Sequence, residues 1–381
     1  MIVTFTPNPS LDKTLVLDAP LRPGAVQRAV GHSAEPGGKG VNISRALTAA
    51  GVPSIAVLPG DAGDAVLLAL QEIQVPARAL PLGAPLRTNT AITDQAGVTT
   101  KINEPGPEFD AALTEALLQL LLEASADATW VALAGSLPPG VPVDFYAQAI
   151  TALRETFGEQ APLIALDTSG EPLAVALPAA PDLIKPNAEE LLELHAAMVG
   201  ASGDAMGDDA ADGGGLGGSP GYGSGDSSGE SSRVDEQARA EALEADPMRA
   251  AQIAVDLQNH GARSALITLG AHGAVLIRHP SVENSAESAE PAVALRAWGP
   301  PIILRSTVGA GDASLAGFLA SAQSGSSPTE SLKHAMAMGR AAAELPGSIM
   351  PTPDQLTTEN LSTEQLILIP RTTATSNVET S

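Results

Sequence analysis

One repeated pattern restricts the fold of this chain: short runs rich in β-branched residues alternate with Ala- and Leu-rich stretches of helical length. The expected strands are Ile2–Thr6, Ser54–Leu58, Thr129–Ala134, Leu163–Asp167, Leu183–Lys185, Ala265–Leu269 and Ala274–Arg278. The expected helices are Val41–Ala50, Ala62–Glu72, Ala111–Ala124, Val143–Phe157, Ala188–Ala197, Met248–His260, Ala313–Ala322 and Thr329–Glu344. Such alternation predicts an α/β fold, with a doubly wound, mostly parallel sheet flanked by helices on both faces. Ligands of such folds bind outside the carboxyl ends of the strands.

Composition narrows the class of protein. The 381 residues suffice for one large α/β domain or two smaller ones. A formal net charge of −24 argues against nucleic-acid binding, which usually needs a basic stripe. The chain has no cysteine, no signal-peptide pattern and no apolar stretch of the ~18 residues that a membrane helix needs. We therefore expect a cytoplasmic protein that acts on neither nucleic acid nor membrane.

Four segments interrupt the alternation. Residues 14–30 and 87–103 alternate polar and apolar side chains, which predicts a small separate β-sheet that forms a lid over the ligand cleft. Residues 201–246 are an acidic insertion with 11 acidic and 2 basic side chains, and its Gly- and Ser-rich part (201–232) is too polar to fold. Residues 355–381 are expected to form a C-terminal tail. The α/β core then comprises residues 1–13, 31–86, 104–200 and 247–354.

The clearest chemical signal lies in residues 306–314. Here Gly309-Ala310-Gly311 is followed directly by Asp312 and then by small apolar residues of helical length. Glycines leave backbone amides uncovered, and a helix start adds unpaired donors and the positive end of its dipole. Asp312 is thus a carboxylate beside a site suited to phosphate, which suggests phosphoryl transfer to a hydroxyl with Asp312 as general base. An isolated turn capped by aspartate would show the same residues.

A second glycine-rich stretch, Gly37-Gly38-Lys39-Gly40-Val41-Asn42, opens a predicted helix. Its glycines would let the backbone approach a ligand, Lys39 brings a charge, and Asn42 can bind sugar hydroxyls. The stretch fits neither a Walker A loop nor a Rossmann fingerprint, because Ser33, Gly40 and Ile43 stand at positions those motifs reserve for other residues. Taken alone, it is more typical of a helix start than of a site.

Isolated charged residues are the next candidates. Asp12 follows the first predicted strand, where a carboxylate can accept two hydrogen bonds from a sugar diol or simply form an Asx-type turn. Three cations, Arg28, Arg87 and Lys101, lie on the predicted lid segments. Together they would recognise a phosphate on the substrate, although singly each is also an ordinary edge-strand charge.

Two further motifs follow predicted strands. In Lys185-Pro186-Asn187-Ala188-Glu189-Glu190, Asn187 and Glu190 share one face at a helix start. Their oxygens suit Mg²⁺ held through water, and the same pair also makes a helix capping box. The stretch Thr268-Leu269-Gly270-Ala271-His272-Gly273 joins two strands. Its glycines would let a nucleotide lie against bare backbone, and a plain hairpin turn explains them equally well.

In this order, the motifs resemble the PfkB branch of the ribokinase-like sugar kinases, over roughly residues 1–200 and 247–350. Four stretches look like the phosphosugar kinases of that branch: Thr4–Asp12, Arg87–Asn89, Gly135-Ser136-Leu137-Pro138 and Leu166–Glu171. Lys39 and residues 100–107 look most like 1-phosphofructokinase. The resemblance implies a ribokinase-like fold with a β lid. Two features depart from the family pattern: Ala313 stands where many relatives have Ser, and the acidic insertion is not usual.

The resemblance also implies roles for the motif residues. Asp312 would be the base and the amides of Gly309, Ala310 and Gly311 the anion hole. The sugar phosphate would contact Asp12, Gly38, Lys39, Asn42, Arg28, Arg87, Lys101 and Ser136. ATP would contact Lys185, Asn187, Thr268, Gly270 and Gly273, with Asn187 and Glu190 facing Mg²⁺ through water. A homodimer formed through the lid is also implied, with Arg28 acting on the partner's site.

The activity expected from this resemblance is ATP-dependent phosphorylation of fructose 1-phosphate to fructose 1,6-bisphosphate. Tagatose-6-phosphate kinase and 6-phosphofructokinase are the alternatives within the family. A non-catalytic sugar-phosphate sensor on the same scaffold is the alternative from another class. The choice among phosphosugars depends on where the lid cations lie, and the sequence does not give that distance.

Overall fold

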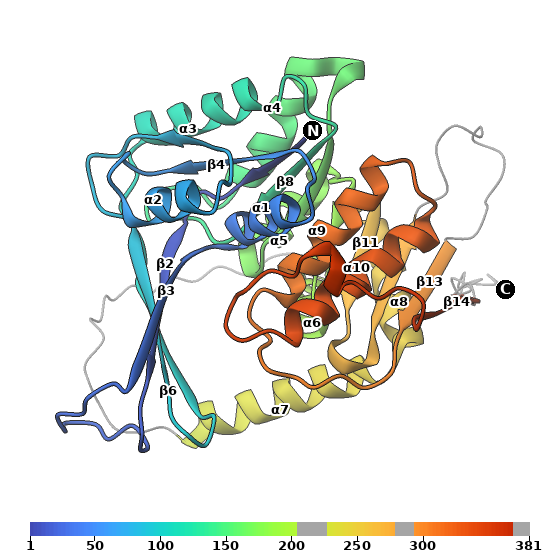
Figure 1. Ribbon diagram of the computed structural model, residues 1–381. Coiled ribbons are helices and arrows are strands. Elements are labelled where there is room, and N and C mark those ends of the chain that lie inside the picture. The colour runs from blue at the N-terminus through green and yellow to red at the C-terminus, as the bar shows by residue number, and fades with distance from the viewer. Residues whose placement is uncertain (204–226, 279–292, 369–381) are drawn as a thin grey trace, which may run out of the picture.

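The computed structural model describes residues 1–203, 227–278 and 293–368 (Figure 1). Among them, ten strands form one sheet in the order β14-β13-β12-β11-β10-β9-β8-β1-β4-β5. The strands are β1 Ile2–Phe5, β4 Ser54–Pro59, β5 Ala77–Leu80, β8 Trp130–Ala134, β9 Leu163–Asp167, β10 Leu183–Ile184, β11 Ser264–Thr268, β12 Ala274–Arg278, β13 Val293–Trp298 and β14 Ser362–Leu366. Strands β5 to β11 in this order pair in parallel, and β12, β13 and β14 are antiparallel. The predicted doubly wound, mostly parallel α/β sheet is confirmed.

Helices cover both faces of this sheet because its strands alternate apolar side chains between two layers. In β8, Val131 and Leu133 pack in one buried cluster, and Ala132 and Ala134 in the other. The first layer holds α3 Ala111–Ala124, α4 Phe145–Phe157, α5 Gly170–Ala176, α6 Ala188–Gly203 and α8 Pro247–Gln258. The second holds α1 Lys39–Ala49, α9 Ala310–Gln323 and α10 Pro328–Ala343, while α2 Ala65–Glu72 packs over the β4 edge. No helix in these ranges is long and apolar enough to cross a bilayer.

The strand order reverses direction at β1. The chain leaves β1 to build β4 and β5 on one side, and then returns to place β8 on the other side, with Phe5 paired to both Val57 and Leu133. The crevice beyond the carboxyl ends of strands at such a reversal is the usual ligand site of open α/β sheets. Asp167 ends β9 and Lys185 directly follows β10, so both lie at this edge.

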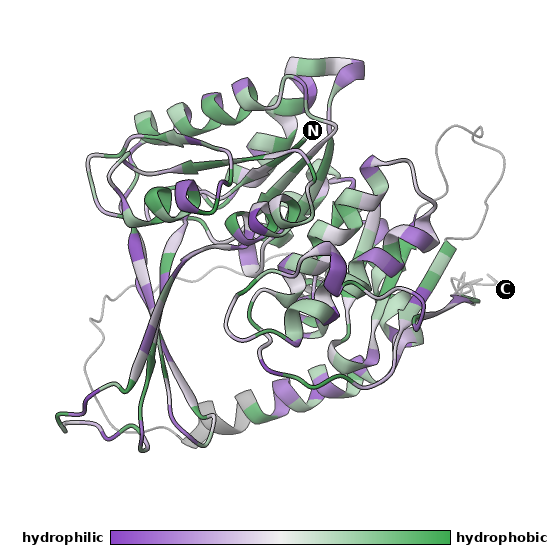
Figure 2. Ribbon diagram, viewed as in Figure 1, coloured by the Kyte–Doolittle hydropathy of each residue, from purple (hydrophilic) through white to green (hydrophobic). Residues whose placement is uncertain are grey.

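A four-stranded sheet in the order β3-β2-β6-β7 forms the lid, which extends away from the core in Figure 1. Its strands are β2 Ser10–Val16, β3 Gly31–Gly37, β6 Arg87–Thr93 and β7 Thr99–Asn103. In Figure 2 these strands mix hydrophilic and hydrophobic residues, whereas the core strands are mostly hydrophobic. The second predicted lid segment thus corresponds closely to β6 and β7.

The first predicted lid segment, 14–30, is largely wrong. Residues 17–30 contain no strand, and the lid strands instead include 10–13 and 31–37, which the sequence pattern places in the core. Pro20 and Pro23 have no amide hydrogen for a ladder, and Gly24 turns the chain with φ of +77°. As a result, Asp12 lies within a lid strand and not at the end of a core strand.

Two segments that the sequence predicts to lack regular structure, the acidic insertion and the C-terminal tail, contain some of it. Of the acidic insertion, residues 204–226 lie outside the described residues, but helix α7 spans Ser227–Glu244. Its end is apolar enough to pack, since Leu243 is buried with α6 and α8. Within the predicted tail, β14 pairs with β13 through Ala294 and Leu366, whereas residues 369–381 lie outside the described residues. These tail residues form a strand because the edge of β13 offers unpaired backbone amide and carbonyl groups.

Strands β5 and β13 were not expected, because Arg78 and Arg296 interrupt their short apolar runs. Several helices also begin or end a few residues away from the expected positions. Helix α9 begins at Ala310, three residues before the expected Ala313, so that the glycine motif lies in its first turn. Such shifts at helix ends are common because terminal turns are weakly specified.

Candidate active site

The first turn of α9 has the geometry of an anion site. Gly309 caps it with φ of +76°, a left-handed conformation that glycine adopts without strain. The Ala310 amide donates to Thr307 (3.3 Å). Of the three predicted anion-hole amides, only that of Ala310 thus has an acceptor within the described residues; those of Gly309 and Gly311 have none, and neither has that of Asp312, as expected for the start of a helix. These free donors and the helix dipole would stabilise a negative charge at this end of the helix.

A buried ammonium group lies beside the same turn. The Nζ of Lys185 would be 3.3 Å from a Cβ atom on Gly311, so Gly311 leaves room for this side chain. The Lys185 side chain is only 5% exposed. Free amides and a buried cation therefore converge on one place, which is what recognition of a phosphate group requires.

The carboxylate of Asp312 lies at this place and is buried. Its Oδ2 accepts a hydrogen bond of 2.9 Å from Nδ2 of Asn42, in the first turn of α1. The pKa of Asp312 is raised to about 6, first by burial and then by the nearby Asp167, although Lys185 and the Asn42 hydrogen bond act in the opposite direction. A carboxylate with this pKa is ionised at pH 7 and still basic enough to take a proton from a reacting hydroxyl.

Asp167 is the second buried carboxylate, and its surroundings are different. Its Oδ1 lies 2.8 Å from Nζ of Lys39, and its Oδ2 lies 3.3 Å from Nζ of Lys185. Although burial alone would raise the pKa of Asp167, the two ammonium groups lower it below the ordinary value. Lys39 also lies 3.2 Å from Oε1 of Glu190. Burial opposes the charge on Lys39, but Asp167 and Glu190 raise its pKa, so the lysine stays charged.

Asn187 and Glu190 form a capping box at the start of α6. The Glu190 amide donates to Oδ1 of Asn187 (2.8 Å), and the Asn187 amide donates to Oε2 of Glu190 (3.0 Å). Within the described ranges, no group of three or more His, Cys, Asp or Glu side chains could enclose a metal ion. Because the oxygens of this pair already accept hydrogen bonds, they fit Mg²⁺ held through water molecules better than direct coordination.

The hairpin between β11 and β12 contains the predicted nucleotide glycines. Thr268 pairs with Asn187 in an isolated parallel bridge, which places the hairpin beside the capping box. Gly270 has φ of +49°, and a Cβ there would lie 2.6 Å from Oε2 of Glu244 on α7. Gly273 has φ of +106°, and its Cβ would collide with the carbonyl of Ala297. A hairpin does join the two antiparallel strands, and the positive φ of both glycines, with backbone packing at Gly273, suits glycine there; the nucleotide contact stays a prediction.

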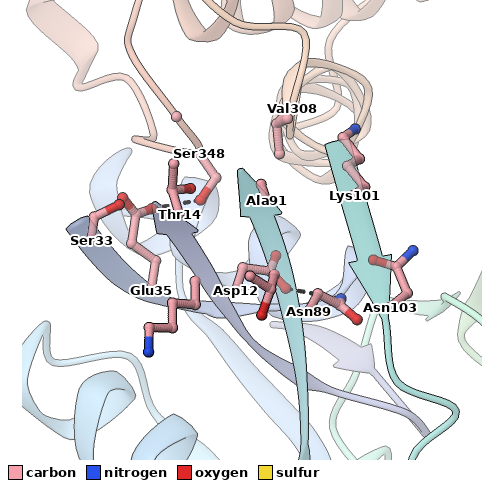
Figure 3. A pocket seen from close by; sticks show the side chains of 13 residues that line it. Asp12, Thr14, Ser33, Glu35, Asn89, Ala91, Lys101, Asn103, Val308 and Ser348 are labelled. Atoms are coloured by element: carbon pink, nitrogen blue, oxygen red, sulfur yellow. Dashed lines mark hydrogen bonds between the residues drawn. The ribbon is translucent and has the colours of Figure 1, made fainter. Parts of the chain in front are cut away.

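The lid carries the polar floor of a pocket (Figure 3). Oδ1 of Asp12 accepts hydrogen bonds from Oγ of Ser10 (2.7 Å) and from Nδ2 of Asn89 (3.0 Å). A Cβ on Gly37 would collide with the Asp12 carboxylate, so this glycine is required for the close approach of β3 to β2. Lid residues and core residues share the lining, with Asp12, Asn89 and Lys101 on one side and Val308 and Ser348 on the other.

The three predicted phosphate-binding cations lie in different surroundings. Arg87 bridges the lid and the core: Nη2 donates to the Asn8 carbonyl (3.0 Å) and weakly to Oγ of Ser136 (3.5 Å), while its Nε has no partner within the described residues. Burial lowers the pKa of Arg87, and the nearby Asp12 opposes this change. Lys101 lines the pocket, but Arg28 lies exposed in the connection between β2 and β3 and is not among the lining residues.

The remaining predicted sugar-side residues lie at the start of α1 and after β8. Gly38 caps α1 with φ of +109°, and a Cβ there would press on the Thr6 side chain at 2.9 Å. Lys39 and Asn42 follow in the first turn and reach Asp167 and Asp312, respectively. Ser136 accepts a hydrogen bond of 3.3 Å from Nδ2 of Asn8. The glycine-rich stretch is thus both a helix start and part of the candidate site.

Sequence reasoning missed several residues of this site. Asp167 had a usable signal, because it is an acidic residue at the end of a buried strand. Arg45, Glu35 and Ser348 form a group next to Asn42, and nothing local in the sequence marked them. Asn89 belongs to the Arg87–Asn89 stretch that resembles the family, but its position opposite Asp12 follows only from the pairing of β6 with β2.

Fold and site together define an α/β protein with a buried carboxylate beside a candidate anion site, and three relatives narrow this class. ATP-dependent 6-phosphofructokinase isozyme 2 of Mycobacterium tuberculosis (strain ATCC 25618 / H37Rv) is 35% identical over 172 residues, 44% of this chain and 49% of that protein. The 1-phosphofructokinase of Xanthomonas campestris pv. campestris is 37% identical over 216 residues, 52% of this chain and 66% of that protein. The 1-phosphofructokinase of Rhodobacter capsulatus is 32% identical over 363 residues, 93% of this chain and 94% of that protein. The match to the first of these relatives spans about half of its length.

The sequence matches the pfkB family carbohydrate kinases over residues 9–207 and 235–355. The chain belongs to this family. Phosphofructokinase-2 from Escherichia coli, in complex with potassium, has a similar structure with a TM-score of 0.68 and 25% identity over 93% of this chain and 96% of that one. Ribokinase from Thermotoga maritima is similar in fold, with a TM-score of 0.62 and 16% identity over 93% of this chain and 97% of that one. The ribokinase-like fold is therefore confirmed.

Proposed function

We propose that this chain is an ATP-dependent phosphosugar kinase that converts fructose 1-phosphate to fructose 1,6-bisphosphate. One observation carries the proposal: the buried carboxylate of Asp312 lies at the free amides of α9 and next to the Lys185 ammonium. A proton acceptor and an anion site at one place suit phosphoryl transfer to a hydroxyl. Relatives named 1-phosphofructokinase in Xanthomonas campestris and Rhodobacter capsulatus support this choice of substrate.

In this reaction, the free primary hydroxyl of the sugar would lie against Asp312, in line with the γ-phosphate of ATP. The Asp312 carboxylate takes the proton of the sugar hydroxyl as the hydroxyl oxygen attacks the γ-phosphorus, and the bond from this phosphorus to the bridging oxygen breaks to release ADP. The amides of Gly311 and Asp312 and the Lys185 ammonium stabilise the charge on the transferring group, and each such donor is typically worth ~3 kcal/mol. When bound, Mg²⁺ would neutralise phosphate charge, and Asn187 and Glu190 would hold it through water.

The lid and the first turn of α1 would bind the sugar phosphate. The Asp12 carboxylate and Asn89 face the pocket and suit sugar hydroxyls. Arg87 and Lys101 would hold the phosphate that the substrate already carries. The other sugar contacts proposed from the family are Gly38, Lys39, Asn42 and Ser136. The proposed ATP contacts are Lys185, Asn187, Thr268, Gly270 and Gly273.

One alternative has an observation in its favour: the relative from M. tuberculosis is named ATP-dependent 6-phosphofructokinase isozyme 2. A coupled ADP-release assay with equal concentrations of fructose 1-phosphate, fructose 6-phosphate and tagatose 6-phosphate separates the candidates. The proposal expects the highest kcat/KM for fructose 1-phosphate. A higher value for either other sugar would change the substrate, and sugar binding without ATP consumption would indicate a non-catalytic sensor.

We also propose that the protein forms a homodimer through the lid. The lid strands and their connections carry exposed apolar side chains, with Val26 at 91%, Val98 at 64% and Ile102 at 57%. Pairing of two lids would cover them and would bring Arg28 toward the partner's site. Sedimentation of the wild type and of Val26→Glu/Ile102→Glu tests this proposal. A dimer that the double substitution dissociates is expected, and a monomeric wild type would contradict it.

A further inference from the structure

The orientation of the Asn42 amide is determined by its two neighbours. Its Nδ2 donates to the Asp312 carboxylate (2.9 Å), and its Oδ1 accepts from Nη1 of Arg45 (3.1 Å). A carboxylate can only accept and a guanidinium can only donate, so the flipped amide would place oxygen against carboxylate and nitrogen against guanidinium. Arg45 therefore selects the orientation that supports Asp312.

Arg45 is itself held on several sides. Its side chain is 10% exposed, and Nη2 lies 3.1 Å from Oε2 of Glu35 on the lid strand β3. Nη1 also donates to the Pro36 carbonyl (3.1 Å) and to Oγ of Ser348 (3.2 Å). The Ser348 hydroxyl in turn donates to Glu35, and both side chains line the pocket in Figure 3. One guanidinium thus joins the lid, the segment after α10 and the first turn of α1.

We infer that Arg45 is a positioning residue for the reaction: it fixes the Asn42 amide against Asp312 and, through Glu35, links this alignment to the lid strand β3. The inference rests on the proposed role of Asp312 as the base. It adds a residue that would touch neither the sugar nor ATP and would act only through Asn42. Without Arg45, the amide can turn its oxygen toward the carboxylate, which would weaken the alignment of the base.

The expected consequence is a change in the titration of Asp312. The charged and polar groups that face it are Asp167 at the end of β9, Lys185 after β10, and Lys39 and Asn42 on α1. Of these, only the Asn42 hydrogen bond depends on Arg45, and it lowers the pKa of Asp312. Loss of Arg45 should therefore raise this pKa, while the three charged groups are left in place.

The test compares Arg45→Met, Arg45→Lys and wild type, with Arg154→Met as a matched control. Arg154 is also a partly buried arginine on a helix, and it donates to the carbonyls of Ala179 and Ala180 far from Asn42. The pH dependence of kcat/KM is measured with the phosphosugar that the wild type uses best. Asp312 is also titrated by carboxyl ¹³C NMR, with its signal identified by comparison with Asp312→Asn.

Arg45→Met should lower kcat by about tenfold and move the acid limb and the NMR titration of Asp312 upward by about half a pH unit to one unit. Arg45→Lys should show a smaller loss of kcat and a smaller shift of the Asp312 titration than Arg45→Met, because lysine keeps one hydrogen-bond donor. Arg154→Met should lower the melting temperature without moving the acid limb of the kcat/KM profile. An unmoved limb and NMR titration in Arg45→Met would overturn the inference. Full activity of Asp312→Asn would instead overturn the proposed base, and the NMR titration would still report on Arg45.

Discussion

The end of β9 and the start of α9 each place a buried aspartate at the same edge of the sheet, with opposite results. Asp167 lies between two ammonium groups, and its pKa is lowered. Asp312 has one amide donor, and its pKa is raised to about 6. Surroundings, and not residue type, therefore keep one carboxylate charged and bring the pKa of the other near the range that the proposed proton transfer needs. The substitutions that follow test this division.

The largest effect is expected for Asp312→Asn on turnover. The amide keeps the shape of the side chain but cannot accept the proton, so kcat should fall by about 10²- to 10⁴-fold. Stopped-flow or quench-flow measurement of ADP formation gives the rate, with circular dichroism as the control for folding. A rate within a few-fold of the wild type would remove Asp312 from the proposed mechanism.

The same substitution at Asp167 should act mainly on stability. Asp167→Asn removes the carboxylate that pairs with Lys185, whose side chain is 5% exposed, and breaking such a buried pair typically costs about 3–5 kcal/mol. Because the pKa of Asp167 is lowered by folding, its contribution is present at neutral pH and is lost as the pH falls through that pKa. Urea unfolding at pH 7.5 should show the loss. Unchanged stability at that pH would show that the lysines do not depend on this carboxylate.

Asp312→Asn should have the opposite sign in the same urea experiment. Folding raises the pKa of Asp312 from 3.8 to about 6, so ionisation of the native carboxylate costs stability as the pH rises above about 4. A neutral amide avoids that cost, which amounts to up to about 3 kcal/mol above pH 7. The gain should vanish near pH 4. Destabilisation at pH 8 would mean that the charge of Asp312 is satisfied in the native state.

A smaller effect is expected outside both regions, for Arg87→Met on the lid. Loss of one guanidinium that would hold the substrate phosphate should raise the KM for the phosphosugar by about tenfold or more. The pH at which the acid limb falls should not move, because Arg87 does not contact Asp312. Steady-state kinetics at several pH values checks both parts. An unchanged KM would place the substrate phosphate elsewhere.

The fold could be predicted well from the sequence where strands are buried and helices are amphipathic. The core alternation identified the parallel strands because buried strands are apolar throughout. The lid was harder, since β2 and β3 lie on either side of a proline-containing connection and include Glu35 and Pro36. Strand β14 could not be expected, because its pairing depends on an edge that only the folded sheet provides.

The candidate site could likewise be predicted only where its residues carry a local sequence signal. Asp312, Lys39 and Asn42 were identified because each belongs to a glycine-rich helix start, which is a local signal. The Asp167 ion pair with Lys39 spans 128 positions, and the Ser348 hydrogen bond with Glu35 spans 313. Contacts between residues so far apart in the sequence produce no local pattern from which they could be predicted. The prediction that Arg28 belongs to the phosphate site finds no support within a single chain, because its loop is exposed.

The pH dependence of kcat/KM tests the central claim most directly. If Asp312 is the base, kcat/KM should fall about tenfold per pH unit below an apparent pKa of about 6, since the protonated carboxyl cannot accept the hydroxyl proton. The residual activity of Asp312→Asn should lack this limb. A profile that stays flat from pH 7 to pH 5, or a limb that persists in Asp312→Asn, would contradict the account.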